Sequence, residues 1–247
     1  MKKTRHLLGI LFSVTLLFFL SIPVLNASTH LVLNDSEKSY FPGLSLKLAE
    51  DASNSWTIDQ VSSSEWKSHF QAVNKNTLLL GVSASSWWIK LKIENQTDLA
   101  NWVIGNNFPF LKQFDLYIQQ EGQDYRRISR GTSTPFAERN ESNRLPLFHL
   151  NDIANTDTTL YFHISNDYQA VLSLWLQTEE SYREQENLRQ LLYGIYYGVM
   201  GGMLLYTFFL FLNLREKVYI DYNLLILTTM MMSFSFNGYA GLMIFLD

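Results

Sequence analysis

The chain has 247 residues, a formal net charge of −4, 47% hydrophobic residues and no cysteine. Its Lys and Arg residues form no cluster or stripe, which argues against nucleic acid as a partner, because phosphate binding requires clustered cations. The lack of cysteine excludes thiol catalysis, cysteine-ligated zinc and iron–sulfur clusters.

The start of the chain has the layout of a secretory signal peptide. A basic segment, Met1–Arg5, precedes the apolar run Leu7–Leu20, and Pro23 and the small Ala27 follow. The apolar run is shorter than the roughly 20 residues that cross a bilayer. We therefore predict a cleaved signal peptide over residues 1–27 and export of the segment that follows. An uncleaved anchor is the alternative.

The middle of the chain, residues 28–180, consists of short segments that alternate apolar and polar residues. The clearest segment places two sets of side chains on opposite faces: Ile89, Leu91 and Ile93 on one, and Trp88, Lys90 and Lys92 on the other. Similar alternation occurs over 114–119, 160–164 and 172–177, with turn-forming residues between the segments. This pattern predicts a mainly β fold, an antiparallel β-sandwich of two sheets. We expect transmembrane α-helices after it.

Two helix starts are expected around this domain. Ser62–Glu65 fits a capping box that leads into a short helix over Trp66–Phe70. Ser181 and Glu184 fit a second capping box. Neither Pro nor Gly occurs from Ser181 to Tyr193, so this helix is predicted to continue unbroken into the membrane.

The C-terminal zone, residues 181–247, is predicted to hold a juxtamembrane helix and two transmembrane helices. Leu191–Leu212 and Tyr222–Leu246 contain no charged residue, and each is long enough to span a bilayer. If the middle domain is exported, the connecting loop Asn213–Asp221 lies in the cytoplasm.

Three glycines recur at four-residue spacing in the first predicted span. Gly194, Gly198 and Gly202 lie on one helix face, which favours close packing of another helix. The alternative is a smooth face exposed to lipid.

Several blocks occur in an order that is typical of one receptor family. They are Trp56–Val61, Trp88–Leu91 with Asn95, Pro109–Leu111, Gly131–Arg139, Tyr193–Gly198 and Asn213–Arg215. In these blocks the chain resembles the 7TM receptors with diverse intracellular signalling modules (7TMR-DISM). The middle is similar to their type 2 extracellular domain, and the end is similar to the start of their seven-helix region.

The resemblance implies a receptor of the bacterial inner membrane, with its N-terminal domain in the periplasm. It implies a jelly-roll-like β-sandwich domain similar to carbohydrate-binding modules and a small-molecule or carbohydrate ligand. A cytoplasmic output module (kinase, cyclase or phosphatase) is then expected in a missing C-terminal part or in another chain, and a homodimer is left open. The alternative is a membrane-tethered, non-signalling module that binds a partner protein or a cell-wall component.

No catalytic motif is found, and the five histidines lack metal-ligand spacing, so we expect no enzymatic activity, metal or cofactor. The candidate ligand-binding residues are aromatic and cationic: Trp88, Lys90, Lys92, Phe136, Arg139 and Arg144. Aromatic rings cover the apolar face of a sugar, and cations bond hydroxyls or carboxylates. In the alternative interpretation, Trp88 packs in the sandwich and the charged residues face water.

Overall fold

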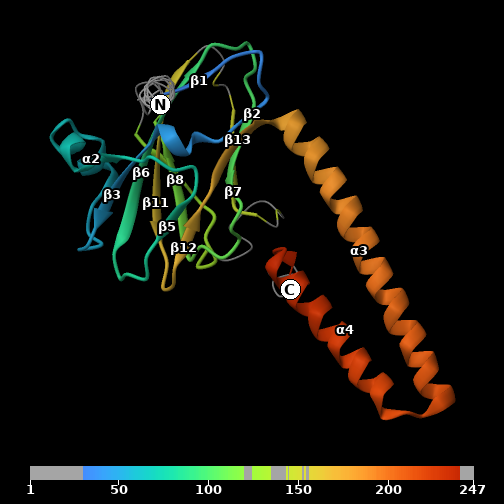
Figure 1. Cartoon of the computed structure of the whole chain (residues 1–247). Coiled ribbons are helices and arrows are strands. Elements are labelled where there is room, and N and C mark those ends of the chain that lie inside the picture. The colour runs from blue at the N-terminus through green and yellow to red at the C-terminus, as the bar shows by residue number, and fades with distance from the viewer. Residues whose placement is uncertain are drawn as a thin grey trace, which may run out of the picture.

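The computed structural model describes residues 30–119, 124–134, 143, 145–151, 153 and 156–239. The described strands occur before residue 179, and two long helices follow them (Figure 1). The predicted signal peptide, residues 1–27, lies outside the described residues.

The larger sheet has the strand order β4-β3-β6-β11-β8-β9, with β1 also beside β6. Its strands are β1 (Leu31–Leu33), β3 (Leu46–Asp51), β4 (Gln71–Ala72), β6 (Ser86–Asn95), β8 (Gln113–Ile118), β9 (Arg126–Ser129) and β11 (Asp157–Ser165). The central pair β6–β11 is antiparallel and sets Ile89 opposite Phe162 and Leu91 opposite Leu160. The described pairs of this sheet are antiparallel except β1–β6, which is parallel.

A second layer faces the larger sheet. It contains a sheet of order β10-β7-β13-β2 and a small pair β12-β5. The strands are β2 (Ser39–Tyr40), β5 (Leu78–Leu80), β7 (Trp102–Asn106), β10 (Leu147–Leu150), β12 (Ala170–Leu172) and β13 (Leu174–Thr178). The core between the layers includes Trp102, Phe114, Phe148 and Phe162, all fully buried. The predicted mainly β, antiparallel sandwich is therefore confirmed.

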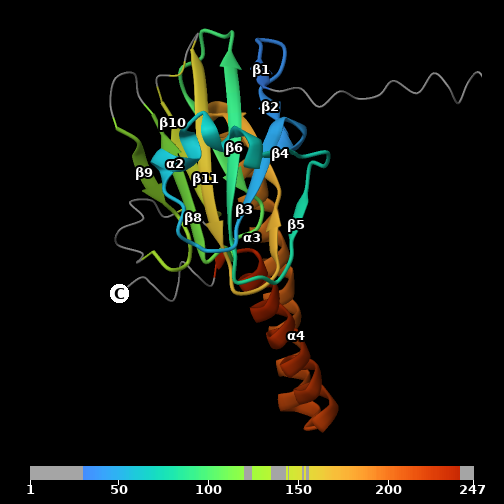
Figure 2. The same cartoon turned by 90° about the vertical axis from the view of Figure 1, so that its left-hand side faces the viewer.

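The outer face of the larger sheet is partly covered by short helices. These are α2 (Ile58–Ser62) and the 3-10 helix η2 (Glu65–His69), and another 3-10 helix, η1 (Pro42–Ser45), precedes β3. Figure 2 shows α2 in front of the larger sheet. At the start of α2, the Thr57 backbone N–H donates to Gln60 Oε1 at 3.0 Å. The capping box predicted at Ser62–Glu65 is wrong, because α2 ends there and the Ser64 side chain caps no helix.

The segment predicted as one strand over 172–177 is divided between two sheets. β12 ends at Leu172 and β13 begins at Leu174. At the break, the Ser173 backbone N–H donates to Asn106 Oδ1 at 2.7 Å. The Asn106 side chain thus replaces a ladder hydrogen bond, and the chain changes sheets at this point.

Two antiparallel helices follow the sandwich: α3 (Glu179–Leu214) and α4 (Lys217–Phe236) (Figure 1). α3 is continuous, as predicted, but it begins before Ser181. Its N-cap is Thr178, whose side chain accepts a hydrogen bond from the Ser181 backbone N–H at 3.3 Å. The predicted capping role of Ser181 is therefore wrong.

Of the helices in the described ranges, α3 is the one long and apolar enough to cross a membrane. Its mean hydropathy reaches 1.7 over its most apolar stretch, none of which is buried. α4 covers only part of the predicted span Tyr222–Leu246, and residues 240–247 lie outside the described part. The second span therefore stays a prediction.

The glycine face of α3 does not contact α4. A Cβ atom built at Gly194, Gly198 or Gly202 would meet no atom of the described part of the chain within 4 Å. α4 packs on another face of α3, where the Thr207 hydroxyl donates to Asn223 Oδ1 at 3.1 Å. Packing of a further helix on the glycine face stays a prediction.

Candidate functional site

A row of polar and aromatic side chains crosses the outer face of the larger sheet. Lys47 on β3 is opposite Lys90 on β6, which is opposite Tyr161 on β11. The row continues through Tyr117 on β8 to Arg127 on β9. The alternation that turns the apolar residues of β6 into the core sends Lys90 to this outer face.

At the β3–β6 end of this row, α2, η2 and the sheet enclose a pocket of about 280 Å³. Its lining combines four lysines with a small apolar wall: His30, Ser45, Lys47, Val61, Lys67, Phe70, Lys90 and Lys92. We call this site the lysine pocket. An apolar surface beside a few convergent polar groups is the usual composition of a small-molecule site.

The charges of the lysine pocket are only partly neutralised by the protein. Lys92 Nζ lies 3.3 Å from Asp157, and His30 Nε2 lies 3.2 Å from Glu94. In contrast, no carboxylate of the described residues forms an ion pair with the other three lysines of the pocket. The pocket therefore carries net positive charge.

Lys90 is the most enclosed of these cations. Its Nζ lies over the ring of Tyr161, 5.0 Å from the centroid. Burial lowers the pKa of Lys90, Tyr125 opposes this change, and the neighbouring Lys92 adds to it. A bound anion would relieve this unfavourable environment for the charged form.

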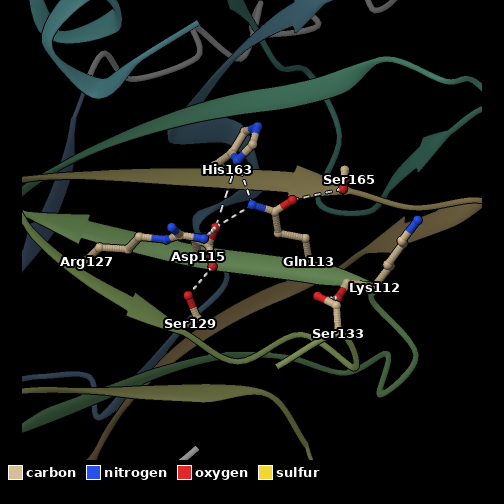
Figure 3. A network of polar contacts seen from close by, with 8 residues as sticks. All are labelled: Lys112, Gln113, Asp115, Arg127, Ser129, Ser133, His163 and Ser165. Carbon is tan, nitrogen blue, oxygen red and sulfur yellow. Dashed lines mark hydrogen bonds and ion pairs between the residues drawn. The ribbon is translucent and has the colours of Figure 1, made fainter. Parts of the chain in front are cut away.

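The opposite end of the same face holds a carboxylate that the protein neutralises fully (Figure 3). The Asp115 side chain is 1% exposed. It accepts hydrogen bonds from Gln113 Nε2 at 2.6 Å, Arg127 Nη2 at 2.8 Å and Ser129 Oγ at 2.5 Å, and His163 Nδ1 lies 3.9 Å away. Burial alone would raise the pKa of Asp115, but these groups outweigh it and hold the pKa below its ordinary value. We interpret this network as structural.

The sandwich meets α3 through an aromatic stack. The rings of Trp175 on β13 and Tyr182 on α3 are nearly parallel, at 11°, with centroids 5.3 Å apart. Trp175 lies against Gly105 of β7, where an added Cβ would come within 2.5 Å of the indole. Two polar contacts add to this junction: His149 Nδ1 to Glu179 Oε2 at 3.0 Å and Lys38 Nζ to Glu180 Oε2 at 3.2 Å. A shift of β7 or β13 would therefore reach α3 directly.

The structure brings two of the predicted ligand-binding residues together and separates a third from them. Lys90 and Lys92 both line the lysine pocket. Trp88 is 1% exposed and stacks on His163, with ring centroids 4.6 Å apart. The prediction that Trp88 offers an open aromatic surface is thus wrong, because the segment around α2 covers it.

In the alternative interpretation, Trp88 packs in the sandwich. Trp88 is indeed buried, but in a cluster on the outer face of the larger sheet and not between the two layers. Trp88 packs with Ala49, Val61 and Tyr161 on the outer face, outside the main core. The other candidates, Phe136, Arg139 and Arg144, lie outside the described residues.

Sequence reasoning missed six pocket residues: His30, Ser45, Lys47, Val61, Lys67 and Phe70. The alternation Leu46-Lys47-Leu48 was a usable signal for Lys47, since it matches a strand with one outward lysine. No local signal placed Lys67 and Phe70 beside β6, because their position depends on how the α2–η2 segment folds back over the sheet.

A β-sandwich joined without a linker to a helix long enough to cross a membrane, together with a match to an extracellular-domain family, indicates a membrane protein with an external domain. The sequence profile of the 7TMR-DISM extracellular 2 family matches residues 43–178, which is more than half of the chain. The chain therefore belongs to this family, and the predicted family resemblance is confirmed.

Similar solved structures are only distantly related. One, CpGH89CBM32-6 produced by Clostridium perfringens, has a TM-score of 0.26 and 11% identity, and the match covers 54% of this chain and 93% of that one. Another, TmCBM61 in complex with β-1,4-galactotriose, has a TM-score of 0.31 and 9% identity, and the match covers 54% and 88%. Comparison with curated proteins gave no match.

Proposed function

We propose that this chain is the ligand-sensing and signal-transmitting part of a bacterial receptor. The sandwich binds a small, carbohydrate-like molecule in the lysine pocket, and α3 carries the resulting change into the membrane. In this receptor the sandwich lies in the periplasm and the helices lie in the inner membrane. It assigns the chain a binding role and no catalysed reaction.

The observation that carries this proposal is the direct continuity of the sandwich with α3. β13 ends at Thr178 and α3 begins at the next residue, so no flexible linker separates them. The Trp175–Tyr182 stack fixes the first turn of α3 against the sheet. A ligand that prefers one arrangement of the sheets would therefore also favour one orientation of α3.

The composition of the lysine pocket supports a polar ligand with an apolar side. Val61 and Phe70 provide the apolar wall, and the lysine ammonium groups donate to hydroxyl or carboxylate oxygens. Sugars offer both kinds of surface, since ring C–H groups lie on their faces and hydroxyls at their edges.

The test measures binding and helix movement on the full chain in lipid nanodiscs. Because the chain has no cysteine, Glu50→Cys on β3 and Gln190→Cys on α3 would carry the only two spin labels. Both positions are exposed. A panel of neutral sugars and uronic acids is screened by thermal shift, and label distances are measured by pulsed EPR with each binder. We expect a saturable rise in melting temperature and a change in the distance distribution.

Tyr182→Ala separates binding from transmission. It removes the ring that stacks on Trp175, so we expect binding to persist while the distance change becomes smaller. Tyr168→Ala, at a ring that is 59% exposed, is the matched control and should leave both unchanged. Binding without any distance change would instead support the tethered, non-signalling module. No saturable binding in a chain that unfolds cooperatively would exclude sensing of these sugars.

A further inference from the structure

The lysine pocket gathers more positive charge than the described residues neutralise. Lys47 and Lys90 are cross-strand partners, and Lys67 reaches the same cavity from η2. Like charges opposite each other in a sheet are unfavourable, and partial burial increases the effect. Such an arrangement attracts an anion, because the anion removes the repulsion as it binds.

The pocket also has a carbon surface, which distinguishes it from a simple anion site. Val61 borders the cavity, but it is only 1% exposed and packs in the outer cluster with Trp88 and Tyr161, so the partly exposed Phe70 supplies most of this surface. The ring of Phe70 lines the cavity and meets Tyr161 edge to face, with centroids 6.5 Å apart. An inorganic anion would leave this apolar wall uncovered, whereas an organic acid would bury it.

The volume of the cavity and the type of its hydrogen-bond donors restrict the class of ligand further. The cavity of about 280 Å³ is near the lower limit of small-molecule pockets, about 300 Å³, which favours a single small molecule. Lysine, the only cationic side chain besides His30 in the described lining, is a point charge that bonds single oxygens.

We propose that the lysine pocket binds a sugar acid, with its carboxylate among Lys47, Lys67 and Lys90 and its ring against Val61 and Phe70. This inference rests on the proposed function and names the chemical class of its ligand. The carboxylate supplies the negative charge that the protein lacks at this point, and the sugar ring fills the apolar side of the cavity.

The test uses two ligands that differ at one group. D-Galacturonate carries a carboxylate where D-galactose carries a hydroxymethyl group. Binding of each to the full chain in nanodiscs is measured by isothermal titration calorimetry, with inorganic phosphate as a third probe. We expect D-galacturonate to bind saturably, D-galactose to bind at least about tenfold more weakly, and phosphate to bind at least about tenfold more weakly.

Lysine variants locate the binding site. Lys47→Met and Lys67→Met should each weaken D-galacturonate binding about tenfold, because each removes one charge-assisted hydrogen bond. Lys67 is exposed on η2 and pairs with no strand, so its replacement tests the site even if Lys47→Met impairs folding. Lys75→Met changes an exposed lysine outside the pocket and should leave the affinity unchanged.

The outcomes separate this inference from the proposed function. Equal binding of D-galactose and D-galacturonate would overturn the inference and leave a sugar sensor. Phosphate binding as tight as that of D-galacturonate would overturn it in favour of an inorganic-anion site. If neither sugar binds, the inference fails, while the broader panel and the helix-distance measurement still decide the proposed function. Unchanged affinity in both lysine variants would also overturn it.

Discussion

The two ends of the outer face of the larger sheet treat their charges differently. At one end, Asp115 is almost fully buried and receives hydrogen bonds from Gln113, Arg127 and Ser129. At the other end, the half-buried Lys47 and Lys90 lie side by side, and the described residues offer them no ion pair with a carboxylate. Asp115 and its partners lie on β8 and β9, and the lysines lie on β3 and β6 of the same sheet. Along the strands, Asp115 is two residues away from the row that contains Lys47 and Lys90.

The contrast suggests how to separate structural from functional charge in this fold. A buried charge whose hydrogen bonds are all satisfied contributes to stability, and its removal leaves its partners unsatisfied. A charge that repels its neighbours lowers the stability of the fold. Its presence therefore indicates a role in binding and not in folding. Three predictions test this division, from the largest expected effect to the smallest.

The largest effect is expected for Asp115→Ala. It leaves Gln113, Ser129 and Arg127 without their acceptor, and we expect a loss of about 2–3 kcal/mol in the free energy of unfolding. Urea unfolding of the full chain in detergent, followed by tryptophan fluorescence, measures it, because all six tryptophans lie in the sandwich.

Asp157→Ala is the matched control for this measurement. Asp157 also pairs with a cation, Lys92, but its side chain is 60% exposed. Exposed pairs contribute little, so we expect a change within about 0.5 kcal/mol. Equal losses in the two variants would contradict the structural role assigned to the Asp115 network.

A smaller effect is expected in the pH dependence of stability, measured with Asp115→Asn. Because the pKa of Asp115 is held below its ordinary value of 3.8, its contribution is fully present above that pH and is lost as the pH falls further, through the folded-state pKa. The stability difference between the wild type and Asp115→Asn should therefore be constant near neutral pH and narrow below about pH 4.

Asp51 provides an internal control for this pH series. The pKa of Asp51 is also lowered: burial opposes this shift, and hydrogen bonds from Ser53, Trp56 and Asn54 outweigh it. Asp51 is retained in both proteins, so the difference between them isolates Asp115. A difference that stays constant down to the acid unfolding transition would show that the carboxylate gains nothing from its charged partners.

Much of the fold could be predicted from local sequence patterns. The alternation over Trp87–Glu94 gave the correct two faces of β6, since side chains alternate across any strand. The run without Pro or Gly before Tyr193 correctly predicted a continuous helix into the apolar zone. Both features depend on neighbouring residues alone.

The errors arose where distant segments meet. Trp88 was on the predicted face, but the cover formed around α2 buries it. The strand break at Ser173 depends on Asn106, which is far away in the sequence. Lys47 and Lys67 join Lys90 only through the pairing of β3 with β6 and the return of η2 over the sheet. Local periodicity carries no information on such contacts.

The smallest effect is expected for Lys90→Met. Unlike Asp115→Ala, it should leave the free energy of unfolding nearly unchanged. Methionine keeps roughly the length of the side chain and removes the charge. The repulsion from Lys92 therefore disappears, along with the contact of Nζ with the Tyr161 ring. That contact is worth about 0.5–1 kcal/mol, and relief of the buried charge offsets it, so we expect stability to change by less than about 0.5 kcal/mol. Urea unfolding of the full chain in the same detergent measures this change in the free energy of unfolding. A loss as large as that of Asp115→Ala would mean that Lys90 stabilises the fold, and the two ends of the sheet would then not differ in kind.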